Sequence, residues 1–470
     1  NKMETIEKYY MNTLDPVITD VCYNPDNNSL YIAGGGYIRK VSIDDDTVET
    51  IFFNDDSVFN NIKIYNDLLI VSDTRQKIVY RINTNKSSEE IKNTITIASL
   101  TNYTIEGFTA VKKAVEIYKK KNPEHQFQFL AYGLNNVKLK AKIMSGYADD
   151  IGIFYMHNYD MYEFIINNVF YDLNKCSEII EKFNLMFDGL KNNFTFNGKI
   201  FGVPRVVSAD AWKVNTELMS TLNLDYPEEN WTWDDFYIYA KKARQDLNND
   251  GQPDTYAAEL QKITPYFLYQ YNSAYFDICQ KTADYNNEEF IDLLKLWKKL
   301  FKEDLVKSTD TINRKIEDNI LFAARQIFTT VAGEETYICA PTLGSKRTYN
   351  NEIGFFMINK DSYNNNACTD FLEIYLSDEV QKFNWNEGFY KMRAMYSPDE
   401  ETMRILSIAM ANSSNFELLN TVFKYSKPNI FNVDFGIYSN QAISDFLTDE
   451  ITAEEAAQLI DKKAKMIVGE

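Results

Sequence analysis

The period of the hydrophobic pattern changes once along the chain, near residue 93, and this change restricts the available folds more than any other feature. Residues 17–82 hold short runs of β-branched and aromatic residues, separated by Asn, Asp, Gly and Pro. Residues 94–100 then form a predicted strand, apolar residues between 108 and 118 recur at helical spacing, and 126–130 predict the next strand. This βαβ order predicts a parallel sheet with a ligand crevice at its carboxyl end.

The N-terminal module contains two sets of predicted strands, with turns at 25–27, 34–36, 44–46 and 73–75. A spacing of about 40 residues between four-stranded sets resembles β-propeller blades. Two blades cannot close a ring. We therefore expect the tail of a longer propeller, two blades packed as a small sandwich on the following domain, or an ordinary antiparallel module.

Composition limits the function. The 470 residues are 45% hydrophobic and 25% charged, which predicts folded cores. The formal net charge of −19 repels polyphosphate and anionic lipid, so nucleic acid is not an expected partner. No apolar run reaches the roughly 18 residues of a membrane helix, and the first residues lack a signal-peptide profile. The protein is thus expected to be cytosolic or to have lost an export signal.

Catalytic motifs and the usual Cys and His spacings of zinc sites are absent from the sequence. The five cysteines have no CxxC spacing and predict buried thiols, while only two histidines, His125 and His157, are present. The sequence lacks GxSxG, GxxxxGK[ST] and HExxH. We expect no enzymatic activity and no cofactor for function. Abundant acids leave a glycosidase open as an alternative, with two carboxylates about 5 to 10 Å apart.

An ordered set of landmarks from residue 94 to the end resembles a known family. These landmarks are MSGYADDI at 144–151, FNGKIFGVP at 196–204, VNTEL at 214–218, WTWDDF at 231–236 and GFFMINK at 354–360. In this order they resemble the extracellular solute-binding proteins of ABC transporters, specifically the family that captures sugars and oligosaccharides. The resemblance covers about four-fifths of the chain.

The resemblance implies an α/β fold: a two-lobe, periplasmic-binding-protein-like (type II) clamp with a hinge, here preceded by a small all-β N-terminal module. The expected divisions are an all-β module at 1–90 and a solute-binding domain at 94–470, with lobe 1 at 94–205 and 355–392 and lobe 2 at 215–340 and 393–470. A capping box at Thr452–Glu455 predicts the start of the closing C-terminal helix.

The resemblance also implies a function. A carbohydrate is captured between the lobes and delivered to the permease subunits of an ABC importer. The protein is expected to be a monomer on the outer face of a bacterial membrane, anchored as a lipoprotein by a cysteine ahead of Asn1. A second hypothesis is a receptor-like or adhesion-like interaction protein that has lost transport.

Candidate ligand-binding residues come from segments that resemble the cleft loops of the family. Sugars are recognised by flat aromatic rings and by bidentate polar side chains. The candidates are Tyr103, Phe154, Tyr155, His157, Asn158, Arg205, Asp210, Trp212, Tyr275, Asp277, Glu334 and Trp385. Trp233 and Trp297 are assigned to packing, and His125 is expected to be exposed.

Residues 246–254, with the sequence DLNNDGQPD, place oxygen ligands at alternate positions around a glycine, as an EF-hand-type calcium loop does. The twelfth position is Ala257 where a bidentate Glu is usual, so a site would need another ligand, with Glu259 in reach. Structural calcium and a solvated polar turn both stay open. The candidate ligands are Asp246, Asn248, Asp250, Gln252 and Asp254.

Overall fold

The computed structural model describes most of the chain. The described residues are 18–44, 47–65, 68–84, 93–101, 104–132, 137–144, 148–157, 161, 164–165, 167–185, 191, 194–277, 280–307, 319–327, 336–343, 347–381, 418, 421–422, 424–428 and 433–469. The chain forms two compact units. Unit 1 comprises 1–181, 200–203 and 354–389, and unit 2 comprises 182–199, 204–353 and 390–470.

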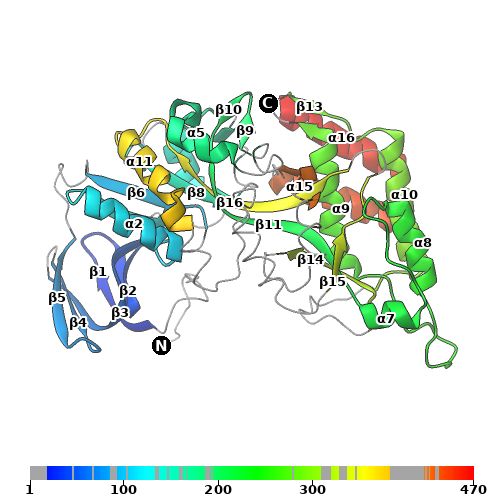
Figure 1. The fold of residues 1–470 in the computed structure, drawn as a ribbon, viewed down its shortest axis with the longest axis horizontal. Coiled ribbons are helices and arrows are strands. Elements are labelled where there is room, and N and C mark those ends of the chain that lie inside the picture. The colour runs from blue at the N-terminus through cyan, green and yellow to red at the C-terminus, as the bar shows by residue number, and fades with distance from the viewer. Residues whose placement is uncertain are drawn as a thin grey trace. The chain divides into compact units, whose positions relative to one another are not determined.

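The N-terminal part of unit 1 is a five-stranded antiparallel meander in which each strand pairs with the next (Figure 1). Its strands are β1 (Ile18–Asn24), β2 (Ser29–Ser42), β3 (Val48–Tyr65), β4 (Leu68–Asp73) and β5 (Ile78–Asn83). The prediction of two blade-like sets is wrong, and the ordinary antiparallel module is the alternative that the structure supports. We call these five strands the β module.

Two long strands account for this error: β3 runs through residues 53–60, where the two sets were predicted to divide, and β2 runs through the glycine run at 34–36, where a turn was predicted. Gly35 pairs with Val58, and the register shifts between Gly35 and Tyr37, which marks a bulge. Gly36 has a φ of +83°, a conformation that glycine adopts at little cost and that bulges use. The glycines therefore bend one long strand and do not separate two short ones.

The β module has its own core, which lies between β2, β3 and β4. Phe52, Phe59 and Tyr80 form a ring cluster with centroids 5.0 to 5.7 Å apart. The fully buried core residues are Tyr31, Ala33, Ile38, Phe59, Ile62, Leu69 and Val71.

The remainder of unit 1 is the predicted βαβ arrangement. Strand β6 (Thr94–Ser99) pairs in parallel with both β7 (Gln126–Ala131) and β8 (Ile153–His157), and β8 pairs antiparallel with β16 (Tyr349–Ile358). The α2 helix (Thr109–Lys121) packs against α11 (Asn365–Tyr375). The other helices here are α3 (Val137–Met144), the 3-10 helix η2 (Leu173–Lys175) and α5 (Ser177–Asn184).

Unit 2 is built on β11 (Val203–Val214), which pairs antiparallel with β14 (Phe322–Ile327) and β15 (Thr336–Cys339). Its helices are α7 (Thr216–Thr221), α8 (Trp233–Ala243), α9 (Leu260–Tyr275), α10 (Glu288–Lys302), α15 (Val433–Leu447) and α16 (Ala453–Gly469). The short strands are β9 (Thr195–Phe196), β10 (Lys199–Ile200), β12 (Phe276–Asp277), β13 (Thr282–Ala283) and β17 (Ser426–Pro428).

Two helices of unit 2 begin with reciprocal capping boxes. Thr232 caps α8 through Asp235, and Thr452 caps α16 through Glu455, whose amide donates to the threonine hydroxyl at 3.1 Å. Each box satisfies two main-chain N–H groups that the helix itself leaves unpaired. The predicted start of the C-terminal helix is confirmed.

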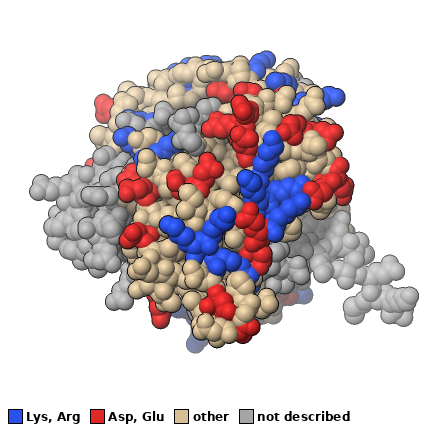
Figure 2. Space-filling view, turned by 90° about the vertical axis from the view of Figure 1, so that its right-hand side faces the viewer, with Lys and Arg blue, Asp and Glu red and all other residues tan. Residues whose placement is uncertain are grey.

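The surface of unit 2 in Figure 2 has interleaved basic and acidic side chains. Lys298 and Lys302 of α10 both pair with Asp449, at 2.7 and 2.8 Å, and Lys295 pairs with Glu454 at 2.7 Å. These pairs join α10 to Asp449, which follows α15, and to Glu454 in the first turn of α16. Among the described residues, no helix is long and apolar enough to cross a membrane.

Candidate functional site

The carboxyl ends of the parallel strands in unit 1 form the first candidate site. Ser99 of β6 is in register with Ala131 of β7 and with Tyr155 of β8, so the three strands end at one edge of the sheet. In open α/β sheets, ligands bind outside this edge. Ser99 and Thr101 place their hydroxyls there, 2.6 Å apart, and the Thr101 amide donates to Ser99 Oγ at 3.2 Å.

His157 is the last residue of β8 and lies at this edge. It is half-buried, and its ring packs edge-on against Tyr155 with centroids 5.9 Å apart. The other histidine differs from its prediction: His125 is half-buried where exposure was expected, because Nδ1 lies 2.7 Å from the Tyr118 hydroxyl and the two rings stack. Since His125 immediately precedes β7, it lies at the amino end of the sheet.

Three predicted ligand platforms are core residues. Phe154 has no exposed surface and packs against Phe164 at 6.2 Å, and Tyr155, equally buried, packs against Phe356 at 5.4 Å. Trp212 is also fully buried. We correct these three assignments, because a side chain without exposed surface presents no face on which a sugar can stack.

Trp212 belongs to an aromatic cluster in unit 2. Its ring centroid lies 5.7 Å from that of Trp231, 5.8 Å from that of Trp233 and 5.4 Å from that of Phe236. Trp233 in turn contacts Trp297 at 5.6 Å. The packing roles predicted for Trp233 and Trp297 are confirmed.

The predicted second-lobe site residues lie around the end of α9. The Tyr275 hydroxyl donates to Glu289, and its ring stacks on Tyr271 at 4.9 Å, so Tyr275 is mainly a packing residue. Asp277 is exposed, and its Oδ1 accepts a hydrogen bond of 2.9 Å from the Gln280 amide. Asp277 retains surface for a ligand.

The remaining candidates divide into two groups. Arg205 is buried on β11, and Asp210 lies on the same strand opposite Gln326. Tyr103, Asn158, Glu334 and Trp385 lie outside the described residues. Of the predicted buried thiols, Cys176, Cys339 and Cys368 are buried and Cys22 is half-buried, while Cys279 lies outside the described residues.

The predicted calcium loop is held by hydrogen bonds from its own main chain. Asp246 accepts from the amides of Asp250 and Gly251, at 3.3 and 2.8 Å, and Asp254 accepts from the amide and side chain of Asn248, at 3.1 and 2.9 Å. Nowhere in the described part of the chain do three Asp, Glu, His or Cys side chains gather where they could hold a metal ion. These hydrogen bonds account for the loop as a polar turn, and calcium stays a prediction.

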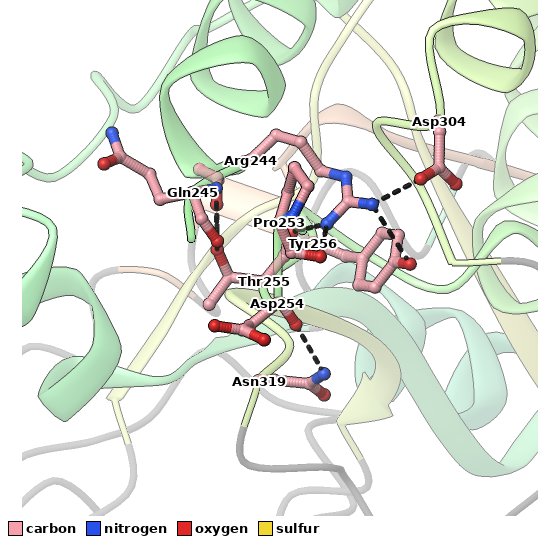
Figure 3. Close-up of polar contacts among 9 residues, drawn as sticks. Arg244, Gln245, Pro253, Asp254, Thr255, Tyr256, Asp304 and Asn319 are labelled. Atoms are coloured by element: carbon pink, nitrogen blue, oxygen red, sulfur yellow. Dashed lines mark hydrogen bonds and ion pairs between the residues drawn. The ribbon is translucent and has the colours of Figure 1, made fainter. Parts of the chain in front are cut away.

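Arg244 fixes the exit of this loop, a role that the local sequence did not reveal (Figure 3). Its guanidinium donates to the carbonyls of Pro253 and Thr255, pairs with Asp304 and lies 4.0 Å from the centroid of the Tyr256 ring. Its partners come from the far side of the loop and from the end of α10, which are adjacent only in the folded chain.

A carboxyl pair on α5 and α11 gives unit 1 a pH-dependent stability. Burial, with repulsion from Glu178 and Asp370, raises the pKa of Glu373 from 4.5 to about 7. A raised carboxyl pKa means that the folded state holds its proton more tightly than the unfolded chain. The protonated Glu373 therefore adds to the free energy of unfolding. This stabilisation is complete below the ordinary carboxyl pKa of 4.5 and is lost as the pH rises through about 7.

We expect Glu373→Gln to raise the unfolding free energy of unit 1 by about 1 kcal/mol at about pH 8 and to leave it unchanged at about pH 4, after allowance for solvent screening. Urea unfolding at both pH values measures this. Glu181→Gln, an exposed change on α5, is the matched control. Equal effects of Glu373→Gln at the two pH values would contradict the assignment.

Comparison with known proteins shows the fold. No family model and no curated protein matches the chain. The chain is similar to an ABC substrate-binding protein from Listeria monocytogenes in complex with cycloalternan (16% identity, 80% of this chain and 99% of that chain, TM-score 0.59). It is also similar to a cyclic α-maltosyl-1,6-maltose binding protein from Arthrobacter globiformis (16% identity, 80% of this chain and 98% of that chain, TM-score 0.59). A third similar structure is the sugar-binding protein MalE from Xanthomonas citri (14% identity, 80% of this chain and 97% of that chain, TM-score 0.59). The predicted two-lobe fold is confirmed.

Proposed function

We propose that this chain is the extracellular substrate-binding component of an ABC importer and that it captures a carbohydrate between its two lobes. This proposal rests on the similarity in fold to sugar-binding proteins. The similarity covers about 80% of this chain and 97 to 99% of the length of those proteins. The carboxyl edge of the unit 1 sheet, where the half-buried side chain of His157 lies at the end of β8, supports it, because sugar hydroxyls require such a donor or acceptor.

The mechanism is capture without chemical change. A ligand that contacts both lobes favours their closed arrangement by its differential affinity for it, and the closed form binds the permease. His157, Arg205, Asp210 and Asp277 are the proposed contacts among the described residues, together with the predicted Tyr103, Asn158, Glu334 and Trp385. We also propose that the protein is a monomer and a lipid-anchored bacterial lipoprotein. Its function needs no cofactor or catalytic residue.

A melting screen against mono- and oligosaccharides, including cyclic glucans, tests the proposal. We expect one of these sugars to raise the melting temperature by several degrees, since a ligand at about 100 times its Kd adds about 2.7 kcal/mol. Chromatography of the same samples should show the sugar intact. Released product would indicate a glycosidase, and the absence of any shift would favour an interaction protein. Repeating the screen with and without calcium tests the 246–254 loop, where an ion-dependent shift would support a structural site.

The two histidines offer a matched pair of variants. We expect His157→Ala to weaken binding of the identified sugar by about tenfold, the loss of one good hydrogen-bond partner. His125→Ala, at the opposite end of the sheet, should leave the affinity unchanged. Calorimetric titration measures both. Equal affinities of the His157 variant and the unmodified protein would remove His157 from the proposed site.

A further inference from the structure

The β module continues the sheet of unit 1 and is not a separate appendage. Strand β3 pairs antiparallel with β7, with Val48 opposite Ala131 and Thr50 opposite Phe129. Since Ala131 is also opposite Ser99, the start of β3 lies at the same carboxyl edge as the end of β6. This register places the β module beside the loop that follows β6.

A buried polar cluster joins the two at that point. Arg39 of β2 and Thr50 of β3 face Thr104 and Glu106 of the loop, and all four residues are at most 8% exposed. Glu106 accepts from the hydroxyls of Thr104, at 2.7 Å, and of Thr50, and its Oε1 lies 3.8 Å from Arg39 Nη2. Arg39 also donates to Thr104 at 3.5 Å. We call these four residues the loop clamp.

A close packing contact supports the clamp. The Tyr37 hydroxyl lies so near Gly107 that a Cβ there would meet it at 2.9 Å, and the Arg39 guanidinium lies 4.4 Å from the centroid of the Tyr37 ring. Ile105, which lies between Thr104 and Glu106 in the sequence, is also buried, with 1% of its surface exposed. The β module therefore contacts residues 104–107 through both charge and shape.

The chemistry of the clamp indicates that it fixes one loop conformation. A buried carboxylate is costly unless a cation and hydrogen-bond donors compensate it, and a network of this kind stabilises only the arrangement in which its partners meet. Burial raises the pKa of Glu106, while the threonines and Arg39 oppose that rise. Moving the loop away from the β module would separate these groups.

We propose that Arg39, with Thr50 and Tyr37, is a positioning element for the ligand site: the β module holds the loop after β6 in the conformation that binds the carbohydrate. This inference rests on the proposed function, because it assigns the β module to the same site. Arg39 acts through Glu106 and Thr104 and needs no contact with the ligand itself.

Two experiments on the full chain test this positioning. The variant Arg39→Met with Glu106→Gln removes both charges together, so that no unpaired charge is left buried. Hydrogen exchange without ligand is the first measurement. We expect the amides of residues 104–107 to exchange faster by at least about tenfold, while the amides of β6 keep their protection. Unchanged exchange at 104–107 would overturn the clamp whether or not the protein binds a sugar.

The second measurement is the affinity for the sugar identified in the screen. We expect the double variant to bind about tenfold more weakly, because the loop then has to be ordered on binding. The matched control is Asp20→Asn, which replaces one of the two carboxylate oxygens that accept from the Val21 and Ile62 amides by an NH2 donor, inside the β module and away from the loop. It should preserve the affinity. Faster exchange with unchanged affinity, or equal losses in both variants, would overturn the proposed role in ligand binding.

Discussion

Replacing Trp212 with alanine is expected to lower the free energy of unfolding of unit 2 by about 4 kcal/mol, the usual range for truncating a buried tryptophan. Trp212 is fully buried, and four aromatic rings, those of Trp231, Trp233, Phe236 and Phe322, have centroids 5.4 to 6.2 Å from its own. Removing the indole leaves a cavity that these large rings cannot fill without giving up their own contacts. Urea unfolding monitored by tryptophan fluorescence measures the loss.

Trp212→Phe is the matched control. Trp212 Nε1 is a buried donor with no hydrogen-bond partner in the described part of the structure, so a phenylalanine removes an unsatisfied group while keeping most of the ring volume. We expect it to cost less than half as much as alanine, about 1 to 2 kcal/mol. A Trp212→Ala protein of unchanged stability that fails to bind sugar would contradict the core assignment and restore the ligand role expected from sequence.

Local signals in the sequence predicted the parts of this fold that depend on neighbouring residues. The βαβ order and the capping box before α16 follow from hydrophobic period and from side chains three positions apart. The turn predicted at Gly34–Gly36 is wrong because glycine is typical of both turns and β-bulges. Only the pairing of β2 with β3 distinguishes the bulge from a turn.

Contacts between distant residues account for what the sequence did not show at the site. Arg39 and Thr104 are 65 positions apart, and no local motif links a strand of the β module to the loop after β6. Trp212 lies between the predicted end of lobe 1 at residue 205 and the predicted start of lobe 2 at residue 215, yet its side chain is fully buried in unit 2. The sequence pattern therefore predicts where the strands end. It does not predict which side chains are exposed at those ends.

A methyl group at Gly152 is expected to destabilise unit 1 by about 2 to 3 kcal/mol, the upper range for overpacking. Gly152 precedes β8, and its amide donates to the Thr96 carbonyl at 3.0 Å while its own carbonyl accepts from the Asn359 amide at 3.0 Å. These bonds fix the main chain between β6 and the end of β16. A Cβ built there would lie 2.5 Å from the Sγ of Cys368 in α11, far inside van der Waals contact.

A double-mutant cycle distinguishes this clash from a loss of backbone flexibility. Cys368 is fully buried, so Cys368→Ala alone should cost about 1 kcal/mol, the loss of one buried sulfur. In the Cys368→Ala background the new methyl group enters the space that Sγ has left, and Gly152→Ala should then cost less than about 1 kcal/mol, a favourable coupling of roughly 2 kcal/mol. Thermal and urea unfolding of the four proteins give this coupling. Strictly additive losses would show that α11 does not lie on Gly152, and the packing of this helix against the sheet would need to be redrawn.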